Sequence, residues 1–274
     1  MPVVTIARQL GSYGNEIARA LAARHNFRYL DTRSLPDYVR EFGDVEPTAP
    51  ELAETRPTFW ERLNEERRRH AIIVRCGVYN FAKDDDCVIV GLGANFLLRG
   101  LDQVLRCMTI APLETRIRRV VERSDGSIDR AAATDAIRRS DRERHGYIRY
   151  MHNTEWTDVH GYDVVLNTQV LTPDLGADYI TYTLERAEIG PTAGSIQKIE
   201  DLALASRVEA VLISNAGIWV HGLRATSDRG VVTIAGEVIT DEDREYAEDV
   251  ARGVEGVRAV VNELRIQPPP LTGM

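Results

Sequence analysis

The first thirty residues carry the feature that most restricts the fold of this chain. An apolar run rich in β-branched side chains, residues 3–7, precedes a turn that contains Gly11 and Gly14, and apolar residues at helical spacing follow the turn. A second short apolar segment, residues 27–30, ends in Asp31. This order of strand, glycine-rich turn, helix and strand is typical of a phosphate-binding α/β unit, in which turn amides and a helix N-terminus face the anion.

The turn departs from the standard phosphate loop, which reads G-x-x-x-x-G-K-[ST]. If Gly14 is the last glycine, Gln9 stands at the first glycine, Asn15 at the lysine and Glu16 at the magnesium-binding hydroxyl. The remaining glycines also suit a strand–helix turn that needs them only for its dihedral angles. From the turn alone, a phosphate site and a purely conformational role are equally supported.

Strands and helices alternate along the first two thirds of the chain. Apolar runs predict further strands at residues 87–94, 104–111 and 162–168. Helical spacing predicts helices at residues 17–24, 59–81, 95–100, 113–123, 129–150 and 173–187, with Gly146 as a break in the fifth, and three prolines make residues 42–58 a loop or broken helix. The alternation predicts an α/β fold, a mostly parallel sheet with helices on both faces.

A second, smaller domain follows a segment rich in glycine, proline and serine at residues 189–195. Beyond it we predict a helix, two strands joined by a turn, a helix capped by Thr240 and a last strand, which together make a small α+β (αββαβ) domain. The predicted boundaries are residues 1–188 for the first domain, 189–195 for the linker, 196–267 for the second domain and 268–274 for a frayed tail.

Charge and cysteine content exclude several classes of protein. The net charge of −8 gives no overall basic field to attract nucleic acid, so no nucleic-acid partner is expected. The three cysteines, Cys76, Cys87 and Cys107, fit no C-x-x-C metal pattern and are interpreted as reduced thiols. No apolar segment suits a signal peptide or a membrane span, so we expect a cytoplasmic protein.

The predicted helix at residues 129–150 is densely basic. Arg138 and Arg142 lie four residues apart and share a face, and Arg144 lies three residues after Asp141. Converging guanidinium groups would neutralise the charge that moves during phosphoryl transfer. The alternative is a surface helix with ordinary ion pairs, but an excess of arginine in an acidic protein favours a functional role.

Residues 3 to about 185 resemble the cytidylate kinase-like family, a divergent branch of the P-loop nucleoside monophosphate kinases. Several separate stretches carry the resemblance. They are residues 6–12 and 16–18, similar to an altered phosphate loop that itself lacks the standard lysine, and then residues 29–32, residues 90–95, residues 111–116, the pair Asp141-x-x-Arg144, and residues 162–168.

The resemblance implies an enzyme that transfers the γ-phosphoryl group of ATP, with Mg²⁺, to CMP, dCMP or a related acceptor. It implies nucleotide contacts from the first crossover, at Arg8, Gly11, Ser12, Tyr13, Gly14, Asn15 and Glu16. It implies that the catalytic residues are Arg138, Arg142 and Arg144. It also implies that the acceptor is bound by Asp31, Arg33, Gly91, Gly93 and Asp141, and that Asp141 contacts the ribose. No residue is assigned as a metal ligand. Asp31 has a structural alternative, as the cap of a helix that begins near Ser34.

Two positions depart from the family pattern. Members often place arginine where this chain has Asn15, and a basic or polar residue where it has Leu92. Each lost charge-assisted hydrogen bond to a phosphate is worth about 1.5–3 kcal/mol. The competing hypothesis is therefore a catalytically impaired nucleotide sensor or scaffold, which signals to a partner through the second domain.

Residues 196 to about 266 resemble a BON domain, on residues 230–236 and 253–262. Such domains are associated with phospholipid surfaces and with protein partners. For this chain we weigh a module for protein interaction or self-association above binding to a membrane surface. The expected partners are thus a nucleotide substrate and either another protein or a second copy of the chain.

Overall fold

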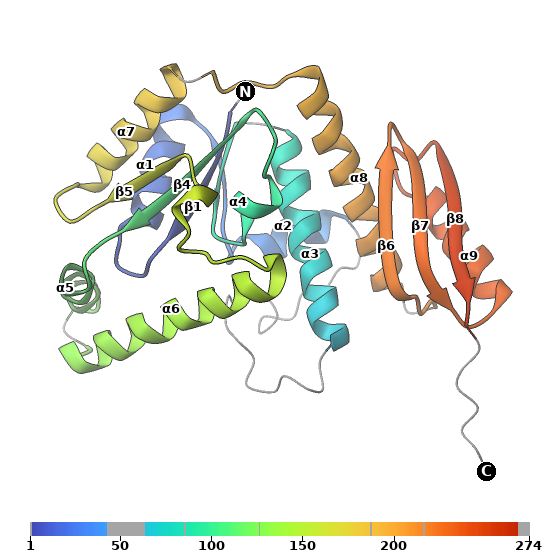
Figure 1. Cartoon of the computed structure of the whole chain (residues 1–274), viewed down its shortest axis with the longest axis horizontal. Helices are drawn as coiled ribbons and strands as arrows, with labels where there is room; N and C mark the ends of the chain where they lie inside the picture. Colours follow the sequence, from blue (N-terminus) through green and yellow to red (C-terminus); the bar gives the residue numbers. More distant parts are fainter. Residues whose placement is uncertain are drawn as a thin grey trace, which may run out of the picture. The chain divides into compact units, whose positions relative to one another are not determined.

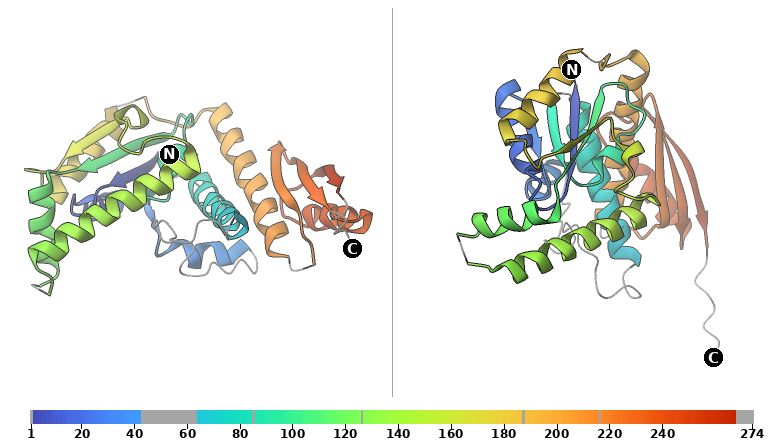
Figure 2. Two further views of the ribbon diagram at one scale, coloured as in Figure 1. Left: turned by 60° about the horizontal axis from the view of Figure 1, so that its bottom comes forward. Right: turned by 60° about the vertical axis from the view of Figure 1, so that its left-hand side comes forward.

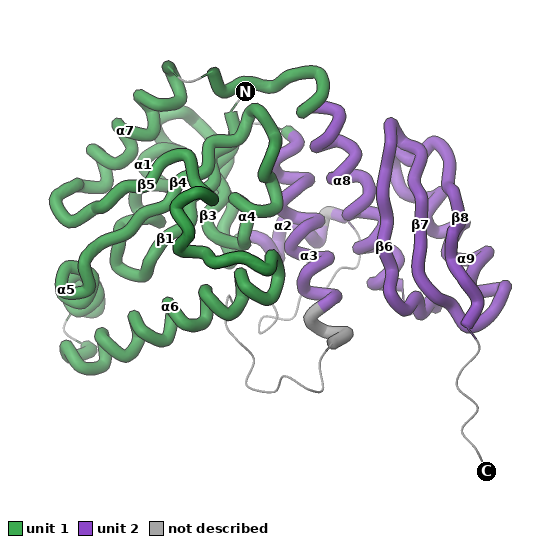
Figure 3. Tube along the Cα trace, viewed as in Figure 1, with its two compact units in different colours: residues 1–34, 53–62, 84–195 green, residues 35–52, 63–83, 196–274 purple. Residues whose placement is uncertain are grey.

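The computed structural model describes residues 2–42, 64–84, 86–125, 127–186, 188–215 and 217–267. Most of the predicted loop at residues 42–58, the predicted start of the next helix at 59–63 and the predicted tail lie outside the described residues. Two compact units divide the chain (Figure 3). The first unit holds residues 1–34, 53–62 and 84–195, and the second holds 35–52, 63–83 and 196–274, so the units do not follow the chain in order.

The first unit is built on a parallel five-stranded sheet with the order β2-β3-β1-β4-β5 (Figure 1), which confirms the predicted α/β architecture. The central strands are buried along most of their length, which explains their nearly continuous apolar sequences. The strands are β1 (Val3–Arg8), β2 (Arg28–Leu30), β3 (Cys87–Val90), β4 (Val104–Ile110) and β5 (Val164–Asn167).

Helices pack on both faces of this sheet. On one face α1 (Gly14–His25) and α7 (Pro173–Arg186) share an apolar core with the strands. These two helices approach closely, because a Cβ at Gly176 would lie 2.6 Å from Cδ1 of Ile17. On the other face Met108 of β4 packs with Ile148, Trp156 and Tyr162. The remaining helices are α4 (Ala94–Leu97), α5 (Leu113–Arg123), α6 (Arg130–His152) and the short 3-10 helix η2 (Val159–Gly161).

The long helix α6 is continuous, and the break predicted at Gly146 is wrong (Figure 2). One glycine inside a helix costs only about 1 kcal/mol relative to alanine. The helix is stabilised by burial of Ile137 and Ile148 and by Asp129, whose carboxylate accepts a hydrogen bond from the Ala132 amide at 2.8 Å. Its length places the residues from 130 to 152 on a single rigid element.

The second unit combines a three-stranded sheet with helices from two parts of the chain. Strand β6 (His221–Asp228) is antiparallel to β7 (Val231–Val238), and β8 (Ala259–Ile266) is parallel to β7. Apolar side chains of α8, β7 and α9 meet in one core around Val208, Val232 and Ala247. The helices are α2 (Leu35–Val39), the 3-10 helix η1 (Arg40–Phe42), α3 (Asn64–Lys83), α8 (Ala193–Ser214) and α9 (Asp241–Arg252).

Two sequence predictions bear on this unit. Thr240 caps α9 as predicted, and Asp243 completes a reciprocal capping box with it. Helix α8 begins at Ala193, so its first turn lies within the segment predicted as a linker. In the described parts of the chain, no helix is both long and apolar enough to cross a bilayer.

Candidate functional site

The crossover from β1 to α1 lies at the point where the strand order reverses. β1 has β3 on one side and β4 on the other, and in such sheets ligands bind at the carboxyl ends of the strands beside this reversal. Gln9 stands at the first glycine of the standard motif, and its side-chain oxygen accepts a hydrogen bond from the Ala111 amide at 3.1 Å. The substitution therefore ties the loop to the end of β4.

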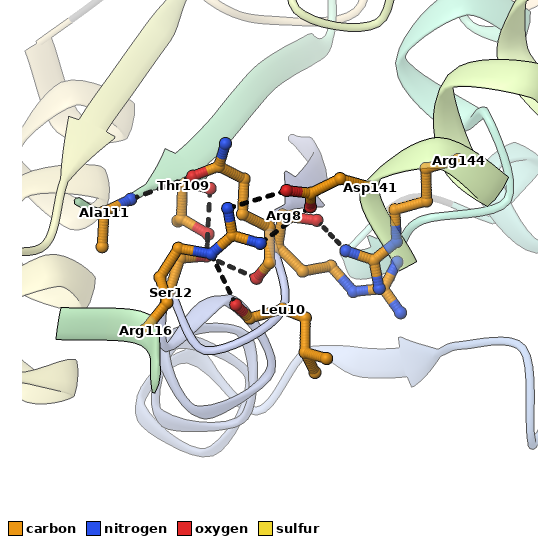
Figure 4. Close-up of polar contacts among 9 residues, drawn as sticks. Arg8, Leu10, Ser12, Thr109, Ala111, Arg116, Asp141 and Arg144 are labelled. Carbon is orange, nitrogen blue, oxygen red and sulfur yellow. Dashed lines mark hydrogen bonds and ion pairs between the residues drawn. The ribbon is translucent and has the colours of Figure 1, made fainter. Parts of the chain in front are cut away.

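Ser12 joins the loop to β4 through hydrogen bonds. Its side chain is fully buried, and its hydroxyl lies 2.8 Å from the Gln9 carbonyl oxygen, 3.0 Å from the Thr109 carbonyl oxygen and 2.8 Å from the Thr109 hydroxyl (Figure 4). Its amide donates to the Gln9 carbonyl at 3.2 Å. Ser12, predicted as a phosphate contact, thus has both its hydroxyl and its amide engaged with the protein and fixes the shape of the turn.

The backbone of the loop has the geometry of an anion nest. Gly11, with φ of +82°, and Tyr13, with φ of +62°, both adopt the left-handed conformation, one on each side of Ser12. Such alternation directs nearby amides to one side, and the first amides of α1 add the partial positive charge of a helix N-terminus. A Cβ at Gly11 would lie 2.9 Å from the Arg116 carbonyl oxygen, and one at Gly14 would lie 2.3 Å from Cβ of Arg8. Both glycines are therefore required by close packing, whether or not a phosphate is bound.

Two buried arginines of α5 donate hydrogen bonds to carbonyl groups of the loop. Arg116 donates through Nε to the Leu10 carbonyl at 2.8 Å, and Arg119 donates to the Gly11 carbonyl at 3.3 Å. In a planar trans peptide the N–H points opposite to the preceding carbonyl, and the described chain has no cis peptide bond. The Gly11 amide therefore points away from Arg116 and α5.

Arg119 makes further contacts that fix the position of its guanidinium group beside the loop. Its guanidinium lies 3.6 Å from the centre of the Tyr13 ring and donates to the Thr168 hydroxyl at 2.9 Å. Sequence reasoning did not assign Arg116 or Arg119 to the loop. The signal available was a pair of arginines three residues apart on the helix that follows the neighbouring strand β4.

Two more arginines meet at the start of the loop. Arg8, the last residue of β1, donates through Nε to the side-chain oxygen of Asn15 at 3.0 Å. Arg144 of α6 donates to the Arg8 carbonyl (Figure 4). A guanidinium group therefore lies against the position that a lysine occupies in the standard motif.

The predicted catalytic arginines are not all at the loop. Arg144 is partly buried there, whereas Arg138 and Arg142 are exposed on α6. Asp141, predicted at the acceptor ribose, accepts two hydrogen bonds from Arg116, at 2.9 and 2.7 Å. The structure thus gives this carboxylate a protein partner, and the pair ties α6 to α5.

Asp31 stabilises the turn after β2 through hydrogen bonds. This resembles the capping role near Ser34 that is the structural alternative for this residue. One carboxylate oxygen accepts from the amides of Arg33 and Ser34, at 2.8 and 3.1 Å, and the other accepts from the Tyr29 hydroxyl at 3.1 Å. Burial, followed by the charge of Asp31, raises the pKa of Tyr29 to about 12. Arg33 itself is exposed.

A small cavity of about 20 Å³ lies beside the loop, and Gly91 and Gly93 form one wall of it. Arg8 and Arg144 reach the same cavity, and Phe96, Trp156 and Tyr162 supply aromatic walls. Asn95 is only 4 % exposed, and its side-chain nitrogen has no hydrogen-bond acceptor among the described residues. Leu92, by contrast, is buried and does not line the cavity.

The donor set near the loop suits phosphate and does not suit a directly bound Mg²⁺. Glu16, at the position of the magnesium-binding hydroxyl, is paired with Arg123. The nearby hydroxyls of Ser12 and Thr109 are hydrogen-bonded to each other. Within the described ranges, no three carboxylate, histidine or cysteine side chains cluster, although Mg²⁺ beside a nucleotide takes only one or two protein ligands in addition to phosphate oxygens and water.

Comparison with known proteins gives the family and the fold. Residues 3–170 match the model of the cytidylate kinase-like family, and residues 200–268 match that of the BON domain. An uncharacterized protein from Eubacterium ventriosum ATCC 27560 has a similar fold, with a TM-score of 0.53 and 19 % identity over 68 % of this chain and 99 % of that one.

A curated relative is also similar to part of the chain. Osmotically-inducible protein Y of Escherichia coli (strain K12) is 29 % identical over 108 residues, which are 38 % of this chain. The chain spans about half the length of that curated relative, 54 %. The match therefore supports a module shared by the two proteins. It gives no information on whether they share an activity.

Proposed function

The chain belongs to the cytidylate kinase-like family, and from this premise we propose that its first unit transfers a phosphoryl group from ATP to a nucleoside monophosphate such as CMP or dCMP. The crossover loop would bind the polyphosphate through the amides of Gly11, Tyr13 and Gly14. The acceptor would enter the cavity beside Gly91 and Gly93.

Arg8 and Arg144 stand between these two subsites. Both line the acceptor cavity, and Arg144 is hydrogen-bonded to the Arg8 carbonyl at the start of the loop. Two guanidinium groups at this place would stabilise the negative charge that develops on the migrating phosphoryl group. Positioning and electrostatic stabilisation supply most of what phosphoryl transfer requires.

The chemistry of the cavity lining carries the choice of acceptor. Among the described residues that line it, none is aspartate or glutamate, but His152 stacks on Phe96 and its Nε2 lies 2.5 Å from the position of a Cβ at Gly93. An alcohol acceptor must lose a proton to a base, whereas a phosphate oxygen is already ionised at neutral pH. A lining without a described carboxylate therefore favours an acceptor that attacks through a phosphate oxygen, and His152 is the histidine beside it.

A transfer assay with γ-labelled ATP and the full chain tests the proposal. CMP and dCMP form one set of acceptors, and alcohols such as shikimate and gluconate form the other. We expect label on the nucleotides alone. Label on an alcohol, or no label beyond that seen in a protein-free control, would contradict the proposal.

A non-catalytic nucleotide sensor is the second candidate. Asn15 and Glu16 replace the lysine and the hydroxyl of the standard motif. In this case the BON-like second unit would signal to a protein partner, or to a second copy of the chain, that nucleotide is bound to the first unit. Calorimetric binding of ATP without any transfer supports this function, and sedimentation of the full chain with and without ATP tests the self-association.

A further inference from the structure

We infer that the crossover loop binds polyphosphate through main-chain amides and guanidinium groups, without a direct protein ligand to Mg²⁺, and that Arg8 carries the charge of the missing lysine. This inference rests on the proposed function and concerns the same loop. It differs from the standard phosphate loop, in which the hydroxyl of the motif holds the Mg²⁺.

Among the described residues, Asn15 and Gly14 contact Arg8 closely and help to fix its position. Its Nε donates to the Asn15 side-chain oxygen at 3.0 Å, and its Cβ and Cγ occupy the space that a Cβ at Gly14 would fill, at 2.3 and 2.9 Å. A lysine at residue 15 would bring an ammonium group to the Arg8 guanidinium, and the two like charges would repel each other. Asparagine instead accepts a hydrogen bond, so the departure at Asn15 fits the presence of Arg8.

Glu16 supplies the second argument. A carboxylate in the first turn of α1 is favoured by the helix dipole, but it would repel a phosphate bound at the same helix end. Arg123 is paired with this carboxylate and offsets its charge. Since the Ser12 and Thr109 hydroxyls are bonded to each other and Glu16 is paired with Arg123, each of these three side chains already has a protein partner.

Arginine can replace both missing groups in electrostatic terms. A guanidinium group donates two parallel hydrogen bonds to a phosphate and keeps its charge at all working pH values. Arg8 and Arg144 bring two such groups to the junction of the loop and the acceptor cavity. Any Mg²⁺ that arrives with the nucleotide would then contact phosphate oxygens and water.

Isothermal titration of the full chain with ATP, in MgCl₂ and in EDTA, tests the inference. The dissociation constants in the two buffers should agree within about threefold. Arg8→Ala should weaken ATP binding about tenfold to hundredfold in both buffers, the loss expected for one charge-assisted hydrogen-bonding group. Arg118→Ala is the matched control, because Arg118 is exposed and its ion pair with Glu122 lies on the surface of α5.

A restored motif gives the complementary result. The variant Glu16→Thr supplies the standard hydroxyl and keeps Asn15 beside Arg8, so its ATP affinity should become at least tenfold stronger in MgCl₂ than in EDTA. Thermal melting checks that each variant folds, and Arg8→Gln serves if Arg8→Ala does not. Wild-type binding that needs Mg²⁺, or that is unchanged in Arg8→Ala and Arg8→Gln, overturns the inference but leaves the kinase proposal intact. Absence of ATP binding in both buffers overturns both.

Discussion

Arg116 and Asp141 form a two-pronged ion pair between α5 and α6, with nitrogen–oxygen distances of 2.9 and 2.7 Å. Arg116 is 4 % exposed, and its Nε also donates to the Leu10 carbonyl at 2.8 Å. One guanidinium group therefore joins the long helix to the crossover loop. Through this residue, the position of α6 and the conformation of the loop depend on each other.

Asp141→Ala should lower the free energy of unfolding by about 3 kcal/mol, because it leaves the buried Arg116 guanidinium without its carboxylate. Chemical denaturation monitored by circular dichroism measures the change. Asp135→Ala, on the exposed face of the same helix, is the control and should change the free energy by less than about 0.5 kcal/mol. If Asp141→Ala is as stable as wild type and has a raised KM for the acceptor, Asp141 binds the acceptor ribose and the account of the ion pair is wrong.

Gly14→Ala should destabilise the first unit by about 1–3 kcal/mol, the usual range for overpacking. The new Cβ would lie 2.3 Å from Cβ of Arg8 and 2.6 Å from the Thr109 hydroxyl, so the strand end or the loop must move. Gly190→Ala is the control, since nothing lies within 4 Å of the corresponding Cβ. If the two variants melt at the same temperature, the close approach of Arg8 to the loop is wrong.

Arg144→Ala should reduce phosphoryl transfer far more than it reduces stability. Arg144 is partly buried and lines the acceptor cavity, whereas Arg142 is exposed on the same helix. Turnover of labelled ATP should fall by at least a hundredfold, as for loss of one group that stabilises the transition state. A larger loss in Arg142→Ala than in Arg144→Ala would show that α6 closes differently over bound substrates.

The three cysteines should be unreactive in the folded chain. All three are buried, and burial raises the pKa of Cys76 from 9.0 to about 12. At pH 8, Ellman's reagent should label no thiol in the native protein and three in guanidinium chloride. Rapid labelling of a native thiol would contradict the burial of these side chains.

The raised pKa of Cys76 also sets the sign of a pH dependence. Its contribution to stability is fully present below pH 9, the value in the unfolded chain, and is lost as the pH rises to about 12, because the unfolded state then releases the proton first. The free energy of unfolding should therefore fall across this window. Cys76→Ala should lose less stability over the same range than wild type.

Regular features of the fold could be read from the sequence because they are local. The β-branched run that forms β1, the helical spacing of Ile17 and Leu21, and the cap at Thr240 each depend on neighbours within a few residues. The predicted break at Gly146 failed because burial of Ile137 and Ile148 outweighs the helix penalty of one glycine. The grouping of α2 and α3 with the C-terminal part of the chain depends on contacts distant in sequence.

The site could be predicted only in outline for the same reason. The two glycines marked the loop, but Arg116 and Arg119 reach it from more than 100 residues away. Asp141 and Arg144 are three residues apart on one helix, and yet one pairs with Arg116 and the other with the Arg8 carbonyl. A sequence pattern gives the side chain and its face of the helix, and the fold decides which partner it meets.

Amide chemical shifts test most directly whether main-chain N–H groups of the crossover loop hold a polyphosphate. In a titration of the isotope-labelled full chain with ATP, the amide resonances of Gly11, Tyr13 and Gly14 should move first and by the most. The Gly190 amide, in the segment before α8, should stay in place. If the loop resonances stay fixed while ATP binds elsewhere, or if no resonance moves, the phosphate site proposed for this loop does not exist.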